Sequence, residues 1–167
     1  MKKTFIISFV LLLILNVVAY LVLPDRVAIH FGKGGGADSF AGKEINFLIF
    51  LGFELLLFAI FFYSPALIEK TPPKWTNLPN KHYWLKEENL PVLKKKLANL
   101  MYEFGTVFFL LFILITFLMI DANQSTPPRL KEHLFFPIFI GFMVYTLYWT
   151  IKFFISFRIP KDRRERY

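Results

Sequence analysis

Four long apolar segments are the feature of this sequence that most limits its fold. They cover residues 4–23, 45–68, 102–120 and 134–154, and each is close to the roughly 20 residues that a helix needs to cross a bilayer. Hydrophobic residues fill 56% of the 167 positions, whereas about 45–50% is typical of soluble domains. The sequence therefore predicts an all-α integral membrane protein with four transmembrane helices.

The first segment has the basic start of a signal peptide, because Lys2 and Lys3 precede it. Its apolar core is longer than the roughly 7–15 residues usual in a signal peptide, and no A-x-A pattern follows it. We expect an uncleaved helix that ends at Pro24, since the residue before a proline avoids the α-helical conformation.

The distribution of Lys and Arg predicts the orientation. If both termini are cytoplasmic, fourteen basic residues lie on the cytoplasmic side of the spans and five lie outside, which satisfies the positive-inside rule. The net charge of +8 comes from residues beside apolar segments. We therefore expect anionic lipid headgroups as partners, and no nucleic acid.

The connection between the second and third spans, residues 69–101, is predicted to be a cytoplasmic loop with an amphipathic helix. Apolar residues recur at helical spacing over 89–104, and this helix either continues into the third span or breaks near Gly105. Three lysines on its other side are candidates for contact with lipid headgroups: Lys94, Lys95 and Lys96. They either only satisfy the positive-inside rule or form a specific lipid or partner site. Trp75, Tyr83 and Trp84 are expected at headgroup level.

Polar side chains inside the spans are the second notable feature. Glu54 lies near the middle of the second span, where an ionised carboxylate is costly. At 1.5 Å per residue, Asn16 in the first span lies at a similar depth, so we expect a protonated Glu54 hydrogen-bonded to Asn16. A role in proton or cation transport is the alternative. Glu103 and Lys152 are predicted to form an ion pair between the third and fourth spans, unless Lys152 extends to the headgroups.

The loop between the first two spans combines an alternating segment, residues 27–31, with a glycine-rich turn. This pattern predicts a short β-strand. Its candidate ligand or partner residues are Pro24, Asp25, His30, Gly36 and Asp38. The His and the two Asp residues could form a weak metal site, but their spacing is not diagnostic, and a loop held by hydrogen bonds and turn formation is the favoured explanation.

Several short motifs in this loop resemble a known domain: Leu23-Pro24-Asp25, His30-Phe31, Gly36, Asp38 and Gly42-Lys43. Together they resemble, over residues 14–58, the bacterial membrane domain of unknown function numbered 1648. That domain also opens the SdpI-type proteins, which are associated with immunity to a toxic peptide and with signalling. The segment 77–85 is similar to one that follows the second span in single-domain members. The resemblance implies a bacterial cytoplasmic membrane.

The expected organisation has four parts. These are a two-helix domain (1–68), the cytoplasmic loop (69–101), a second helix pair (102–157) and a basic cytoplasmic tail (158–167).

The sequence predicts binding rather than catalysis. It contains no Cys and no hydrolase or zinc-protease motif, so we expect no enzyme activity and no cofactor. We expect a small multi-pass membrane protein that binds or senses a peptide, a ligand or a membrane partner. Transport that uses Glu54 and toxic-peptide immunity are the alternative functions.

Overall fold

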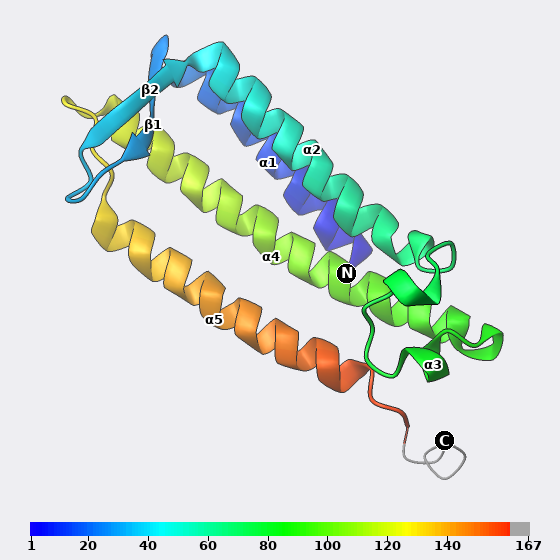
Figure 1. Cartoon of the computed structure of the whole chain (residues 1–167). Helices are drawn as coiled ribbons and strands as arrows, with labels where there is room; N and C mark the ends of the chain where they lie inside the picture. The colour runs from blue at the N-terminus through cyan, green and yellow to red at the C-terminus, as the bar shows by residue number, and fades with distance from the viewer. Residues whose placement is uncertain (161–167) are drawn as a thin grey trace.

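The computed structural model describes residues 1–160, so the predicted basic tail lies mostly outside the described residues. Four helices form an elongated bundle (Figure 1): α1 (Lys2–Val22), α2 (Lys43–Leu67), α4 (Leu90–Gln124) and α5 (Glu132–Ser156). Each is long and apolar enough to cross a membrane. Three short helices lie between α2 and α4: η1 (Pro73–Trp75), α3 (Lys81–Trp84) and η2 (Glu87–Asn89). The four predicted apolar segments are thus confirmed as helices.

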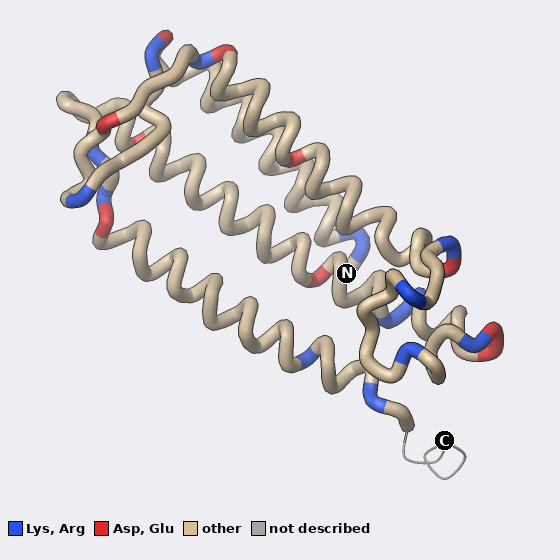
Figure 2. Tube along the Cα trace, viewed as in Figure 1, with Lys and Arg blue, Asp and Glu red and all other residues tan. Residues whose placement is uncertain are grey.

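The bundle has two distinct ends. The β-strands and the α4–α5 connection form the hairpin end, residues 23–42 and 125–131. The N-terminus, residues 68–96 and the end of α5 lie at the opposite end, which we call the basic end (Figure 1). Charged residues gather at these two ends, and the helices between them carry few charges (Figure 2). This is the charge distribution expected of a bundle that crosses a bilayer.

Helices α1, α2 and α4 share a core rich in phenylalanine. Its buried members are Phe5, Phe9, Leu12, Phe61 and Phe109. Helix α5 lies along α4, and none of its residues is buried. The described spans are therefore a three-helix unit with a fourth helix attached at one side.

Helix α4 passes Gly105 without a break, so the amphipathic segment and the third span are one helix. Asn89 precedes it and Pro91 occupies its first turn, where a missing N–H costs nothing. A Cβ atom on Gly105 would lie 2.6 Å from a ring carbon of Phe5 and 2.9 Å from one of Phe61. The missing side chain of Gly105 therefore allows α1, α2 and α4 to pack closely.

The basic end has a small core of its own. Tyr83 and Trp84 are buried there, packed with Leu93, Leu97 and Phe157. The indole Nε1 of Trp84 donates a hydrogen bond to the carbonyl oxygen of Phe157 at 2.8 Å. These two side chains therefore pack inside the protein, because the loop folds back over the end of α5, and their position at headgroup level stays a prediction. Trp75 is 74% exposed and remains a candidate for the headgroup region.

The loop between α1 and α2 is a β-hairpin rather than one strand. Strand β1 (Arg26–Phe31) pairs antiparallel with β2 (Ala37–Gly42). The all-α prediction is corrected to a mostly helical protein with a small two-stranded sheet. Strand β2 was not predicted because ADSFAG lacks the β-branched residues typical of strands. Its conformation depends on hydrogen bonds with β1.

Candidate binding site at the hairpin end

The hairpin is fixed to helix α4 by Asn123. The Oδ1 atom of Asn123 accepts a hydrogen bond from the backbone N–H of Ala28 at 2.7 Å, and its Nδ2 atom donates to the carbonyl of Ala28 at 3.2 Å. Ala28 and Asn123 are both buried. The amide side chain satisfies both backbone groups of one strand residue, as a neighbouring strand would.

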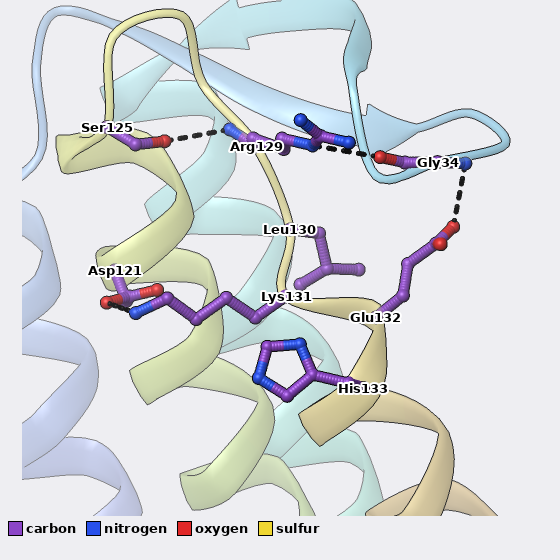
Figure 3. A pocket seen from close by; sticks show the side chains of 8 residues that line it. All are labelled: Gly34, Asp121, Ser125, Arg129, Leu130, Lys131, Glu132 and His133. Carbon is purple, nitrogen blue, oxygen red and sulfur yellow. Dashed lines mark hydrogen bonds and ion pairs between the residues drawn. The ribbon is translucent and has the colours of Figure 1, made fainter.

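The hairpin turn is held by the connection between α4 and α5 (Figure 3). The N–H of Gly34 donates to Oε1 of Glu132 at 3.0 Å, and its carbonyl accepts from Nε of Arg129 at 3.0 Å. The N–H of Leu130 donates to the carbonyl of Gly35 at 2.8 Å. Two loops that are far apart in the sequence thus form one hydrogen-bonded unit.

The turn requires glycine at Gly34 and Gly35, which have φ angles of +82° and +78°. A Cβ on Gly35 would also lie 2.2 Å from the carbonyl oxygen of Leu130. Gly36, the glycine singled out from the sequence, is exposed and has open space around it. The conformational constraint therefore lies mainly on Gly35.

The other predicted loop residues separate into two exposed pairs. Nδ1 of His30 contacts Oδ1 of Asp38 across the strands at 2.5 Å, and Nζ of Lys43 lies 2.7 Å from Oδ1 of Asp25. Pro24 follows an extended Leu23 at the end of α1. Within residues 1–160, no group of three His, Asp or Glu side chains is placed to hold a metal ion. Asp25 does not join the His30–Asp38 pair, because Lys43 holds it at the start of α2.

The contact with Lys43 shifts the pKa of Asp25. The hydrogen bond from Lys43, and then its positive charge, lower the pKa of Asp25 below the ordinary value. A lowered carboxyl pKa means that the pair stabilises the fold at neutral pH, and that this contribution is lost as pH falls through the lowered pKa. Both groups reach solvent, so the contribution is small.

A hollow of about 510 Å³, lined by several charged residues, lies beside the turn. In Figure 3 the side chains of Arg129 and Glu132 reach Gly34, while Lys131 extends to Asp121 on α4. Nζ of Lys131 lies 2.7 Å from Oδ1 of Asp121. The charges that line the hollow are therefore paired with structural partners.

The predicted polar contacts inside the spans are present. Nδ2 of Asn16 donates to Oε2 of Glu54 at 3.2 Å, and both residues are buried. Nζ of Lys152 lies 2.6 Å from both carboxylate oxygens of Glu103. These contacts confirm the predicted pairs, and the protonation of Glu54 remains a prediction.

The three lysines of the basic end have different surroundings. Lys94 pairs with Glu69. Nζ of Lys96 donates to the carbonyl of Ser156 at 3.0 Å and lies 4.7 Å from the centre of a Trp84 ring. Lys95 is exposed. Lys96 thus helps to hold the end of α5, and lipid contact by this group stays a prediction.

Sequence reasoning missed the residues that connect the two loops, which are Asn123, Arg129 and Glu132. Asn123 follows a long apolar run, and such a position is also typical of an ordinary interfacial residue. Arg129 lies in the α4–α5 connection and Glu132 begins α5, and neither belongs to a motif. The contacts join residues about 95 positions apart, which no local pattern reveals.

Replacing Asn123 with Ala tests the attachment of β1. We expect a loss of about 2 kcal/mol in unfolding free energy, because an unsatisfied buried backbone group costs about 1–3 kcal/mol. Unfolding of the purified protein in detergent measures the loss. Gln124→Ala changes the exposed neighbour and should stay within about 0.5 kcal/mol of the parent. Equal stability of the two variants would contradict this role.

Comparison with known families identifies the part of the chain that builds the hairpin. Residues 7–53 match the family model "Domain of unknown function (DUF1648)". This range covers most of α1, the whole hairpin and the first part of α2. No curated protein and no solved structure matches the chain. Residues 7–53 are therefore a domain of the DUF1648 family.

Proposed function

We propose that this protein binds a peptide, a ligand or a membrane partner at its hairpin end, with that end outside the cytoplasmic membrane of a bacterium and both termini inside. One observation carries the proposal. The hairpin is held rigidly by Asn123, Arg129 and Glu132, while the His30–Asp38 pair on its strands faces solvent. Recognition residues are often carried by loops on a rigid scaffold. The excess of basic residues at the opposite end supports the orientation.

A binding role is favoured over a catalytic one by the pairing of the charged side chains. Asp25 pairs with Lys43 at the start of α2, and Asp121 pairs with Lys131 in the α4–α5 connection. Glu132 accepts a hydrogen bond from Gly34 and joins the two loops. No cofactor is proposed. At the basic end, we propose that exposed lysines such as Lys95 contact anionic lipid headgroups, each contributing about 1 kcal/mol.

Photo-crosslinking in native membranes tests the proposal. A photoreactive phenylalanine at Phe40, which is exposed on β2, should give an adduct of defined mass. The matched position is Trp75, an exposed aromatic residue at the basic end, and it should not give that adduct. The adduct should disappear in His30→Ala and Asp38→Ala variants that unfold at the same temperature as the parent. The proposal would be contradicted if the adduct persisted in both variants, or if the photoreactive residue at Phe40 gave no adduct.

Transport is the second candidate, because Oε1 of the buried Glu54 has no hydrogen-bond partner among the described residues. Immunity to a toxic peptide, as in SdpI-type proteins, would be a special case of binding at the hairpin. The domain match covers residues 7–53 and carries no activity with it.

Substitution of Glu54 separates a packing role from a transport role. For packing, Glu54→Gln should keep the contact with Asn16 and leave thermal stability in detergent near that of the parent. Glu54→Leu leaves the Asn16 amide unpaired and should cost roughly 0.6 kcal/mol more, the average for such bonds in membranes. A proton flux in proteoliposomes that Glu54→Gln abolishes without loss of stability would favour transport instead.

A further inference from the structure

A second, mostly apolar pocket lies beneath the hairpin. It has a volume of about 280 Å³ and is bordered by β1 above and by residues of α2, α4 and α5 at its sides. Its apolar lining includes Phe31, Phe50, Ile115, Met119 and Phe135. Phe50 and Phe135 are only half-buried. Two walls of the pocket thus lie partly exposed on helices that we expect to contact lipid.

Asn46 is the unusual residue of this pocket. It lies in the first turn of α2, lines the pocket, and is only 6% exposed. Among residues 1–160, its side-chain amide makes no hydrogen bond. The amide atoms are not fully enclosed by protein, so they face the open space of the pocket. An occupant with a hydrogen-bonding group can therefore pair with the amide.

The polar and apolar parts of the pocket lie at different depths. Asn46 lies about 4.5 Å along the helix axis from Lys43, and Phe50 lies about 6 Å further. On α4, Ile115 lies about 12 Å deeper than Asn123, which contacts the hairpin. A molecule in this pocket thus meets a hydrogen-bonding group near the membrane surface and hydrocarbon-like walls below it.

We propose that this pocket binds an uncharged single-chain amphiphile from the leaflet at the hairpin end, with a hydroxyl group hydrogen-bonded to Asn46. The amide both donates and accepts, which suits a hydroxyl. A charged headgroup has no free counter-charge here, because Nδ1 of His30, the one ionisable residue in the lining, pairs with Asp38. The volume of about 280 Å³ is slightly below the range of about 300–1,000 Å³ found for ligand pockets, so it suits a single chain. The pocket shares His30 with the outer surface of the hairpin, but the proposed contact with Asn46 does not depend on the proposed function.

Photolabelling with a defined alcohol tests this proposal. The probe is octanol with a diazirine in its chain, added to the full-length protein in phosphatidylcholine vesicles. We expect adducts to concentrate on Ile115, Leu118, Met119 and Phe135, above the level at Ile49, an exposed position on α2. Unlabelled octanol should compete at lower concentration than octane, which has no hydroxyl. Labelling spread evenly over lipid-facing residues, or equal competition by octane, would overturn the proposal.

Two variants complete the test. Asn46→Leu should weaken octanol competition about threefold, the equivalent of the roughly 0.6 kcal/mol average for one such bond. It should not lower stability without octanol, because it removes an unpaired buried amide.

Ile115→Phe should fill the pocket and reduce labelling to the level at Ile49, whereas Ile49→Phe should leave pocket labelling unchanged. Normal labelling and competition in both pocket variants would contradict the assignment. If Asn46→Leu unfolds, the Ile115→Phe and octane results decide alone.

Discussion

Gly35→Ala is expected to reduce the unfolding free energy by about 3 kcal/mol. The left-handed conformation at φ +78° costs a residue with a Cβ about 1–2 kcal/mol. The added methyl group would lie 2.2 Å from the carbonyl oxygen of Leu130, so the backbone must move. That movement also breaks the hydrogen bond from Leu130 to Gly35, worth about 0.5–1.5 kcal/mol. Unfolding in detergent measures the effect.

Gly36→Ala is the matched control, because it adds the same methyl group one residue later, where no atom lies within 4 Å. We expect a change within about 0.5 kcal/mol. If the two substitutions have equal effects, the hairpin turn is not held against the α4–α5 connection as described.

Gly105→Leu is expected to reduce stability by about 2–3 kcal/mol through overpacking. The buried rings of Phe5 and Phe61 occupy the space that the new side chain needs. The ring of Phe5 is stacked on Phe58 and Tyr102, so it cannot move away freely. The loss should be measured by unfolding in detergent.

Gly52→Leu and Gly141→Leu are the controls for Gly105. Both glycines have open space at the Cβ position. Leucine is a better helix former than glycine by up to about 1 kcal/mol, so neither control should destabilise the protein. A Gly105→Leu variant as stable as these controls would show that α1, α2 and α4 do not pack as closely as described.

The helices could be predicted because their signal is local. About 20 apolar residues in a row favour a spanning helix wherever the partners lie. The Asn16–Glu54 contact was also predictable, because depth in the membrane follows directly from the rise per residue. The ion pair of Glu103 and Lys152 follows from the same argument for neighbouring antiparallel helices.

The hairpin and its attachment could not be predicted in the same way. Strand β2 has weak strand propensity and depends on β1 for its hydrogen bonds. Asn123 accepts a hydrogen bond from Ala28, which lies 95 positions away in the sequence. The burial of Trp84 depends on the end of α5, which approaches only in the folded chain. Each of these features arises from tertiary contacts.

Thiol labelling tests most directly the claim that the hairpin end is outside the cell and the basic end is inside. The protein has no cysteine, so Lys33→Cys in the hairpin turn and Lys70→Cys after α2 each introduce one thiol at an exposed position. A maleimide that cannot cross membranes should modify Lys33→Cys in intact cells and Lys70→Cys only after permeabilisation. Modification of Lys70→Cys alone in intact cells would reverse the orientation, and modification of both would contradict the spanning arrangement.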